Sequence, residues 1–350
     1  MFGLVRNQDL LLTVAWKNDS VVFIDQRKLP NKLVYVRCYD YKEVADMIRK
    51  LVVRGAPAIG VSAAFGLALA ARQSNAKTVP ELMADLNSAF EVLRTTRPTA
   101  VNLFWALERV MGKAIRAKTV EEAKKRVLDE SLKMAQEDID TNRKIGAHGV
   151  KLFKDGDIVL THCNAGSLAT VAYGTALGVV RAAKESGKRL SVIATETRPV
   201  MQGSRLTAFE LQHDGIDVSL IPDTAVGHMM ATGAISRVIV GADRVLHTGH
   251  VFNKIGTYQV AILANKHNIP FYVAAPLSTF DFESSPDDVI IEERSVDEVV
   301  RVGKKRMAPK GVRVFNPAFD MTPPELITGI ITQKGLLTPP FEKNIKTLLG

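Results

Sequence analysis

The sequence is poor in cysteine and has no metal-binding pattern of histidines. Only 2 of its 350 residues are cysteines, Cys38 and Cys163, and they lie far apart in the chain. This spacing supplies neither a disulfide framework nor a set of thiolate metal ligands. The 7 histidines include no HxxxH or HExxH pattern, which would be typical of a zinc site. We therefore expect a protein of a reducing compartment that binds no metal.

The sequence also lacks a hydrophobic run long enough to cross a membrane. Its best candidate, residues 55–71, carries no charge, contains Pro57 and Gly60 near its start, and is shorter than the roughly twenty residues that a span requires. The N-terminal segment carries Arg6 and Asp9 where a signal peptide would have an apolar core. We expect a buried helix at residues 55–71, a cytoplasmic location and no membrane partner.

No cluster of basic residues dominates the sequence, although its net charge is +9. Lysines and arginines are spread along the chain, and the short cluster at residues 304–306 is not interleaved with aromatic residues. This distribution does not favour nucleic-acid binding, whereas an anionic metabolite needs only a few well-placed basic groups. Hydrophobic residues make up 46% and charged residues 24%, a balance typical of a globular enzyme. We expect a small anionic substrate and no nucleic-acid partner.

The pattern of hydrophobic residues changes along the chain and predicts two domains. Up to about residue 130 short strands mix with helices, whereas from residue 157 onward apolar strands alternate with helices. In the first part we expect strands at residues 21–26 and 33–39, and helices at residues 41–53, 55–72, 79–94 and 120–147. In the second part we expect strands at residues 157–163, 189–197, 217–223, 237–243 and 270–276, and helices at residues 168–186, 206–213, 226–230 and 258–266. Alternation of this kind implies βαβ units around a parallel sheet that is buried on both faces.

The predicted fold class is α/β, with a Rossmann-like parallel-sheet domain over residues 131–350 and a smaller mixed α+β domain over residues 1–130. Ligands of open parallel sheets bind beyond the carboxyl ends of the strands. The polar residues expected at those ends are Cys163, Glu196, Asp223 and Asp243. We expect two or more of these side chains to face one crevice.

Cys163 and Asp243 are the strand-end residues best suited to chemistry. Cys163 precedes a turn at residues 164–167 that we expect to open a helix, whose unpaired amide groups would stabilise a thiolate or hold a phosphate. The alternative is a buried structural cysteine. Asp243 follows an apolar strand, and a carboxyl group whose pKa is raised by burial can act as a general acid. The alternative for Asp243 is a helix cap or a salt bridge to Arg244.

Two arginine-containing turns in the first domain are candidate anion sites. Arg54 offers a fork for phosphate and Gly55 allows close approach of the backbone, although both also fit an ordinary turn before a buried helix. Arg97 follows a helix that Pro98 prevents from continuing. An arginine in such a loop is more often merely solvated.

Two loops of the second domain are also rich in polar residues. The loop after the second expected strand of the sheet holds Glu196, Arg198, Gln202 and Arg205. This density of polar groups at a strand end favours a site over a plain turn. A later loop holds Asn253, Lys254 and Gly256 just before a helix. That loop fits either an anion-binding helix start or a simple cap.

Several strings of this sequence, in order from residue 25 to beyond residue 320, are similar to those of one enzyme family. They are DQRKLP, VRGAPAIGVSAA, RPTAVNL, THCNAGSLATVAYGTALGVVR, ETRPVMQGSRLTAFEL, GADRV, NKIGTYQVAILA, APLSTFD and NPAFDMTPPELI. On these strings the chain resembles the methylthioribose-1-phosphate isomerases, which act in methionine salvage. Strings of this length are far more specific than a short glycine motif.

The resemblance implies a catalytic pair, Cys163 of the CNAG turn and Asp243 of the GADR string. It implies seven further residues that contact the substrate: Arg54, Gly55, Ala56, Arg97, Gln202, Asn253 and Lys254. It also implies a sugar phosphate substrate, a homodimer, and no metal or nucleotide cofactor. Two departures, Phe209 in place of a frequent tryptophan and the segment 246–252, bear on the 5-substituent of the sugar more than on the reaction.

Other functions and two reaction routes stay open at this point. A related isomerase would act on ribose 1,5-bisphosphate or a 5-deoxyribose 1-phosphate, but segment 246–252 supplies no obvious basic residues for a second phosphate. Regulatory subunits of translation initiation factor two B share the implied fold and act by binding, without need of Cys163 and Asp243. In the isomerase, Asp243 would protonate the ring oxygen. Either a Cys163 thiolate then removes the proton at C2, or a hydride shifts directly from C2 to C1.

Overall fold

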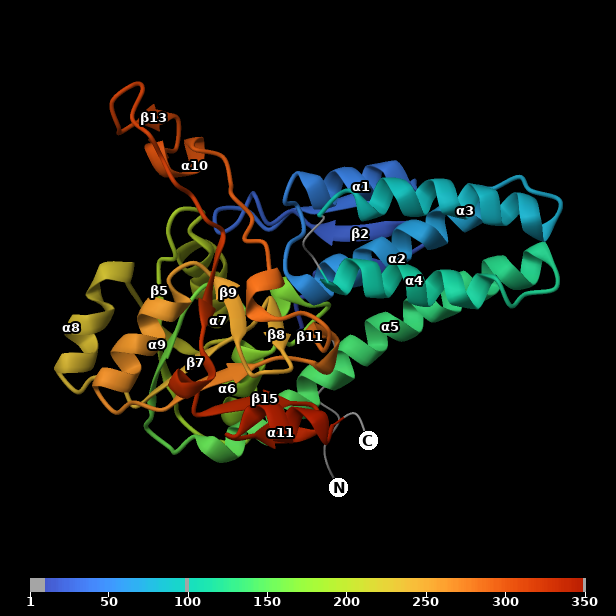
Figure 1. The fold of residues 1–350 in the computed structure, drawn as a ribbon. Helices are drawn as coiled ribbons and strands as arrows, with labels where there is room; N and C mark the ends of the chain where they lie inside the picture. Colours follow the sequence, from blue (N-terminus) through green and yellow to red (C-terminus); the bar gives the residue numbers. More distant parts are fainter. Residues whose placement is uncertain (1–9, 98–100, 349–350) are drawn as a thin grey trace. The chain divides into compact units, whose positions relative to one another are not determined.

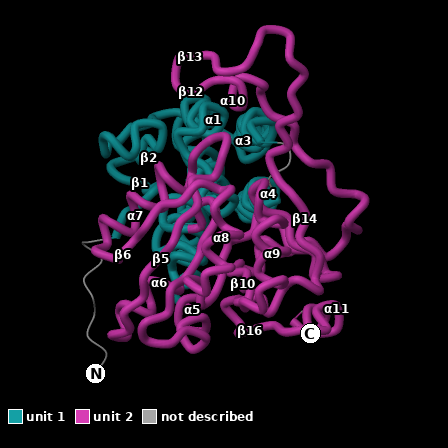
Figure 2. The backbone as a smooth tube through the Cα atoms, turned by 90° about the vertical axis from the view of Figure 1, so that its left-hand side faces the viewer, with its two compact units in different colours: residues 1–143, 166–178 teal, residues 144–165, 179–350 magenta. Residues whose placement is uncertain are grey.

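The computed structural model describes residues 10–97 and 101–348, which form two compact units (Figure 2). Unit 1 comprises residues 1–143 and 166–178, and unit 2 comprises residues 144–165 and 179–350. The boundary that we expect near residue 130 lies inside a continuous helix, α5 (Val120–Gly149), which runs from unit 1 into unit 2. Each unit is described by itself below.

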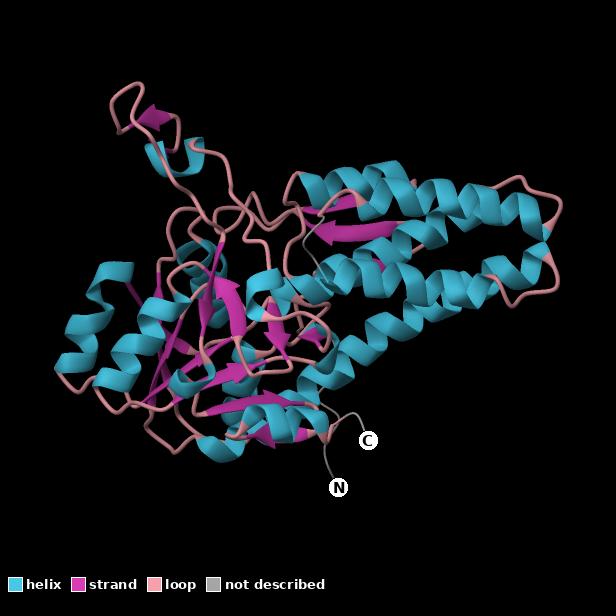
Figure 3. Ribbon diagram, viewed as in Figure 1, coloured by secondary structure: helices cyan, strands magenta, loops and turns pink. Residues whose placement is uncertain are grey.

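Unit 1 combines a small antiparallel sheet with helices (Figure 3). Its strands are β1 (Val14–Trp16), β2 (Val21–Ile24) and β3 (Tyr35–Cys38). Its helices are α1 (Tyr41–Arg49), α2 (Ala56–Gln73), α3 (Val79–Arg94), α4 (Val101–Ala114) and most of α5. The two expected strands and the four expected helices are confirmed, although α1 ends four residues early. We did not predict β1 or α4.

The helix α2 forms the centre of unit 1. Nearly all of its side chains from Ala58 to Ala71 are buried, because α1, α3 and α4 pack around it. The small residue Gly60 permits the approach of α4, since a Cβ atom there would lie 2.8 Å from the carbonyl oxygen of Asn102. The expected buried helix is thus confirmed. No helix in the described part of the chain is long and apolar enough to cross a membrane.

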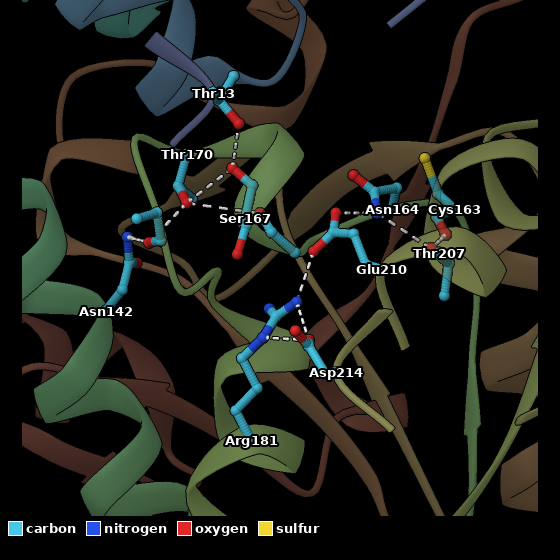
Figure 4. A network of polar contacts seen from close by, with 12 residues as sticks. Thr13, Asn142, Cys163, Asn164, Ser167, Thr170, Arg181, Thr207, Glu210 and Asp214 are labelled. Carbon is cyan, nitrogen blue, oxygen red and sulfur yellow. Dashed lines mark hydrogen bonds and ion pairs between the residues drawn. The ribbon is translucent and has the colours of Figure 1, made fainter. Parts of the chain in front are cut away.

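The chain enters unit 1 a second time, over residues 166–178. Polar side chains of unit 1 hold this segment: Thr13 Oγ1 donates to the carbonyl oxygen of Ser167 (2.7 Å), and Gln26 Nε2 donates to that of Leu168 (2.7 Å). Figure 4 shows the contact of Thr13 with Ser167. The Asp138 carboxylate accepts a hydrogen bond from the Val171 amide (2.7 Å).

The helix that we expect over residues 168–186 is wrong in its first half. The chain forms only a 3₁₀ turn at Ser167–Ala169, and the helix α6 covers Ala176–Glu185. Side chains of unit 1 bind the carbonyl groups of residues 167 and 168 and hold this segment in a non-helical course. Positive φ angles at Tyr173 (73°) and Gly174 (81°) also interrupt any helix before α6.

Unit 2 is built on a seven-stranded sheet with the order β16-β15-β10-β7-β4-β5-β6. Its strands are β4 (Ile158–Thr161), β5 (Ser191–Thr195), β6 (Asp217–Ile221), β7 (Arg237–Val240), β10 (Phe271–Ala274), β15 (Gly329–Thr332) and β16 (Gly335–Leu337). All pairs are parallel except β15 with β16. Numbered along the chain, the parallel strands lie in the order 3-2-1-4-5-6, which is that of a Rossmann fold. The predicted fold class is confirmed.

Most of the remaining elements of unit 2 flank this sheet, whereas α10 and β13 lie on an arm that projects away from it (Figure 1). The helices after α6 are α7 (Ala208–His213), α8 (Val226–Ala231), α9 (Thr257–Lys266), α10 (Asp297–Val300) and α11 (Phe341–Lys346). A second sheet has the order β11-β8-β9-β14, with β8 (Arg244–Leu246), β9 (Val251–Lys254), β11 (Phe280–Asp281) and β14 (Phe319–Thr322). A short hairpin joins β12 (Arg301–Val302) and β13 (Lys305–Arg306). The second sheet, which we did not predict, begins immediately after Asp243.

Candidate active site

The two candidate catalytic residues follow neighbouring strands at the point where the strand order of the main sheet reverses. Strands β4 and β7 are paired, with Val159 opposite Arg237. From β4 the chain proceeds to β5, and from β7 it proceeds to β10 on the other side. Cys163 lies two residues beyond the end of β4 and Asp243 three residues beyond the end of β7. In sheets of this type the ligand crevice opens at such a switch point.

The main chain of Cys163 is held in a conformation that side-chain-bearing residues rarely adopt. Its φ angle is +63°, in the left-handed region. The Cys163 amide donates to Thr197 Oγ1 (2.9 Å), and its carbonyl oxygen accepts from Thr207 Oγ1 (2.6 Å; Figure 4). Thr197 itself has a φ angle of +63°. Each such residue costs on the order of 1–3 kcal/mol, and strain of this kind is concentrated at functional sites. The geometry therefore favours a functional cysteine over a merely structural one.

The turn behind Cys163 is fixed by a buried polar network rather than by a helix. Asn164 Nδ2 donates to Glu210 Oε1 (2.9 Å) and to Thr207 Oγ1 (3.2 Å). The other Glu210 oxygen accepts from Arg181 (2.8 Å), and Glu210 is fully buried (Figure 4). The helix N-terminus that we expect directly behind Cys163 is wrong, because the chain forms a 3₁₀ turn there. The fixed polar groups of the Cys163 turn are thus the threonine hydroxyls and the Asn164 amide.

The loops after β4, β5 and β6 meet at Thr197. Its amide donates to Asp223 Oδ1 (2.7 Å), while its hydroxyl accepts the Cys163 amide. The Arg198 amide donates to the other Asp223 oxygen (2.7 Å). Two of the four expected strand-end residues, Cys163 and Asp223, are therefore connected through one residue. Glu196 belongs to the same loop as Thr197, and its amide donates to the carbonyl oxygen of Ile221.

Gln202 lies on the same loop and is buried. Its Oε1 atom has no hydrogen-bond partner within the described ranges. A buried amide oxygen without a partner costs free energy, and in native proteins it is unusual. This atom is therefore available to accept a hydrogen bond from a ligand hydroxyl. The residue after it, Gly203, packs so closely on Thr195 that no larger side chain fits there.

Asp243 lies between the main sheet and the second sheet of unit 2. Its amide donates to the carbonyl oxygen of Phe252 (2.9 Å), which belongs to the β8–β9 hairpin. Arg244, the partner considered for an ion pair with Asp243, bonds to the carboxylate of Asp281 (3.0 Å). In the segment 246–252, which follows Arg244 along the chain, the apolar residues Leu246 and Phe252 are buried.

Asn253 and Lys254 end the strand β9. Asn253 Nδ2 donates to Thr257 Oγ1 (3.0 Å). Lys254 Nζ donates to the carbonyl oxygen of Ala318 (2.9 Å) and lies 4.4 Å from the ring centre of Phe319. Both residues are thus held in place by neighbouring groups of unit 2.

Asp320 caps the helix that follows this loop. Its carboxylate accepts from the amides of Gly256 (2.6 Å) and Tyr258 (3.1 Å). Of the two alternatives for the start of α9, a cap and an anion site, the structure favours the cap for these two amides. We did not single out Asp320 from the sequence, where its only signal is the NPAFDMT string.

The remaining candidate residues belong to unit 1. Arg54, Gly55 and Ala56 are consecutive at the start of α2, where Gly55 has a φ angle of +94°. A Cβ atom on Gly55 would lie 2.3 Å from the carbonyl oxygen of Ala169. The group that lies close to the Gly55 backbone is therefore the backbone of Ala169 in the same chain. Gly55 also provides no side-chain cap for the amides of the first turn of α2.

Arg97 follows α3 at the edge of the described residues, and Pro98 lies outside them. Within the described ranges no group of three or more His, Cys, Asp or Glu side chains is arranged to hold a metal ion.

Comparisons with known proteins agree on one family. The model of the Initiation factor 2 subunit family matches residues 52–339. A methylthioribose-1-phosphate isomerase of Fervidobacterium nodosum is 56% identical over 340 residues, which cover 96% of this chain and 97% of that protein. A putative methylthioribose-1-phosphate isomerase of Archaeoglobus fulgidus is 53% identical over 337 residues, covering 96% of this chain and 99% of that protein.

Solved structures similar to this chain carry two kinds of name. The 5-methylthioribose 1-phosphate isomerase of Pyrococcus horikoshii is 47% identical, with a TM-score of 0.90, and the match covers 97% of this chain and 95% of that one. An Archaeoglobus fulgidus structure described as translation initiation factor eIF-2B, subunit delta, is 52% identical, with a TM-score of 0.88 and a coverage of 97% and 99%.

The buried carboxyl group of Asp320 predicts a pH dependence of stability. Removal from water raises the pKa of Asp320 to about 6, so the folded state binds more protons than the unfolded state between pH 3.8 and about 6. This contribution to stability is lost as the pH rises through that window, by at most about 1.4 kcal/mol per pH unit. Asp320→Asn keeps only one of the two acceptor oxygens, a loss that does not depend on pH, and its side chain does not titrate. The stability of the parent relative to Asp320→Asn should therefore fall between pH 4 and 7, as measured by denaturant unfolding.

Asp155→Asn is the control for this measurement. Hydrogen bonds from Arg189 lower the pKa of Asp155 to about 2, so this carboxylate is ionised throughout the window. Because the unfolded carboxyl titrates near 3.8, the stability of the parent relative to Asp155→Asn should rise slightly up to about pH 5 and stay constant from there to pH 7. A constant difference for Asp320→Asn as well would show that its carboxyl group is not removed from water.

Proposed function

This chain belongs to the Initiation factor 2 subunit family, and we propose that it is the isomerase that converts 5-methylthioribose 1-phosphate to 5-methylthioribulose 1-phosphate in methionine salvage. Near-full-length relatives of more than half identity carry that name. The observation that supports a catalytic role is the strained, hydrogen-bonded turn of Cys163 at the switch point of the sheet. The proposed reaction is an aldose–ketose isomerisation.

The first chemical task is to open the sugar ring. The anomeric carbon carries the phosphate, so the sugar has no free aldehyde through which it can readily enolise. We assign Asp243 the role of the acid: in its protonated form it gives a proton to the ring oxygen while the bond from that oxygen to C1 breaks. A positioned acid of this kind typically contributes about 10²–10⁴ in rate.

The second task is to move hydrogen from C2 to C1. In the route that uses Cys163, its thiolate takes the proton from C2, and the electron pair of that bond forms a double bond between C1 and C2. Cys163 then returns a proton to C1, while the hydroxyl proton at C2 passes to the Asp243 carboxylate and leaves a ketone. At the end of the reaction Cys163 is again a thiolate and Asp243 is again protonated. In the alternative route a hydride moves directly from C2 to C1.

Binding of the substrate is assigned to the remaining candidate residues. Arg54, Gly55 and Ala56 open α2 at an end without a side-chain cap, which suits a phosphate. Arg97 and Lys254 add positive charge for the phosphate and for the charge that develops during reaction. Two amide side chains, Gln202 and Asn253, are assigned to the sugar hydroxyls. The Gln202 oxygen, which has no hydrogen-bond partner among the described residues, supports this assignment.

A binding function without catalysis is the second candidate. It is favoured by one observation, the name eIF-2B, subunit delta, given to an Archaeoglobus fulgidus structure that is 52% identical to this chain. Pure binding would explain neither the strain at Cys163 nor the buried network behind it.

A turnover assay with three sugar phosphates tests the proposed substrate. We expect the purified protein to convert 5-methylthioribose 1-phosphate at about 1 s⁻¹ or faster, in the range of ordinary enzymes. Ribose 1,5-bisphosphate should react at least about a hundredfold more slowly, because a second phosphate needs strongly basic partners and the segment 246–252 holds no lysine or arginine. The 5-deoxyribose 1-phosphate should lie between them. Absence of turnover with all three would favour the binding function.

Two substitutions should damage the reaction in different ways. Asp243→Asn keeps the size of the side chain but cannot transfer a proton, so kcat should fall by about 10²–10⁴ with little change in KM. Arg97→Ala removes a phosphate contact that is present before and during reaction, so it should act mainly by raising KM. Steady-state kinetics of both variants check this. Equal effects on KM alone would contradict the role of Asp243.

The homodimer implied by the resemblance stays a prediction. The edge strand β6 exposes Leu220 by 49%, and an exposed edge strand is a surface that proteins commonly cover. We expect light scattering at low micromolar concentration to give the mass of a dimer; a clean monomer would overturn it. The metabolic role also predicts a cytoplasmic location and no nucleic-acid partner.

A further inference from the structure

We propose that His162 is a positioning residue of the active site, and that a directed chain of hydrogen bonds leads from the Cys163 amide through Thr197, Thr195 and His162 to the carbonyl oxygen of Ile255. The chain would hold the catalytic turn against the loop that follows β9. The catalytic part of this inference rests on the proposed isomerase function. The existence and direction of the chain do not depend on it.

The chain is continuous and buried. The Cys163 amide lies 2.9 Å from Thr197 Oγ1, and that atom lies 3.2 Å from Thr195 Oγ1. Thr195 Oγ1 lies 2.7 Å from His162 Nδ1, and His162 Nε2 lies 2.9 Å from the carbonyl oxygen of Ile255. His162 is 2% exposed, and both threonines are fully buried. Water therefore does not compete for these bonds.

The direction of every bond follows from the two ends. The carbonyl oxygen of Ile255 can only accept, so His162 Nε2 carries the hydrogen, and Nδ1 of the neutral ring must accept from Thr195. At the other end the Cys163 amide can only donate, so Thr197 Oγ1 accepts it. The Thr197 hydroxyl then donates onward to Thr195, either to Oγ1 or to the carbonyl oxygen (3.3 Å). With a neutral ring, both of these positions of the Thr197 hydrogen satisfy the whole chain.

This arrangement requires an uncharged His162. Burial lowers the pKa of His162, and the nearby charge of Lys254 lowers it further, whereas the hydrogen bond to Ile255 and the charge of Asp223 oppose the shift. A protonated ring would carry a hydrogen on Nδ1 and would force the Thr195 hydroxyl to turn away. The neutral ring therefore keeps the Thr195 hydroxyl directed at Nδ1, so that Thr195 Oγ1 can accept from Thr197.

The chain connects parts of the candidate site that are distant in sequence. Ile255 directly follows Asn253 and Lys254, which are assigned to the substrate. Gly256, the next residue, lies against the His162 ring, where a Cβ atom would approach ring atoms to 3.0 Å. A shift of the ring would thus reach both the Cys163 turn and the Lys254 loop. This is the physical reason for a polar, buried histidine directly before the catalytic residue.

The first test measures the hydrogen positions without any substrate. Nitrogen-15 NMR of histidine-labelled protein, with His162→Asn used to assign the signal, reports the tautomer of the ring. We expect the Nε2–H form, with a pKa lowered from that of an ordinary imidazole because the ring is buried. An Nδ1–H tautomer, or a titration near the ordinary value of 6.5, would overturn the chain even if the protein is an active isomerase.

The second test measures positioning through two isosteric substitutions. Thr195→Val removes the central hydroxyl of the chain. Thr322→Val is the matched control, because Thr322 is equally buried in unit 2 and its hydroxyl has no hydrogen-bond partner in the described residues. We expect Thr195→Val to lower kcat by about 10–100-fold with KM changed less than about twofold, as for a misplaced catalytic group. Thr195→Ser, which keeps the hydroxyl, should restore most of kcat.

A third readout keeps the inference separate from the proposed function. Alkylation of Cys163 by iodoacetamide needs no substrate, and Cys38 does not interfere because burial raises its pKa to about 12. Thr195→Val should change the alkylation rate at least about threefold, and Thr322→Val should leave it unchanged. Equal rates and equal kcat values for the two valine variants would reduce His162 and Thr195 to packing residues and overturn the proposal. Turnover that is absent from the parent, with altered alkylation, would overturn only the catalytic part.

Discussion

The arrangement of the candidate site depends on two hydrogen bonds that threonine side chains make to the main chain of Cys163. A left-handed conformation is unfavourable for this residue, and the hydroxyls of Thr197 and Thr207 hold it from both sides. These threonines come from the loop after β5 and the turn that precedes α7. The order of the strands therefore brings both threonines next to the Cys163 turn. Since Thr197 is itself strained and held by Asp223, the constraint extends over three successive loops.

The turn is also constrained further along the chain. Asn164 is bound to Glu210, a fully buried carboxylate paired with Arg181, and breaking such a pair typically costs about 3–5 kcal/mol. Beyond Ala165 the chain enters unit 1, where Thr13 and Gln26 bind the carbonyl groups of the next segment. Polar contacts thus hold the short stretch that follows Cys163 at both of its ends. Polar contacts, and not the helix N-terminus that we expect there, thus hold the turn in place.

Much of the fold follows from local patterns, and much of the site does not. The bounds expected for α3 agree with the structure because a capping box at Thr78 and a terminal Arg94 mark them in the sequence. Five of the six parallel strands were recognisable as apolar runs, whereas β15 was not predicted. The second sheet was not, because its strands are two to four residues long and pair with distant segments. The helix expected after Cys163 was predicted to begin too early for a similar reason. Side chains that are distant in sequence, those of Thr13 and Gln26, hold the segment that precedes the observed helix. Asp320 escaped notice because its role depends on the pairing of β14 with β9.

The central claim is that the turn after β4 places Cys163 for proton transfer at C2 of the sugar. Running the isomerisation in heavy water, with the parent and with Cys163→Ser, tests it most directly. The account predicts deuterium at C1 of the ketose product, and loss of at least about a hundredfold in kcat with near-normal substrate affinity in the serine variant, since a hydroxyl of similar size is a far weaker base. A product free of deuterium, together with substantial activity of Cys163→Ser, would show that Cys163 is not the base and that hydrogen moves as a hydride.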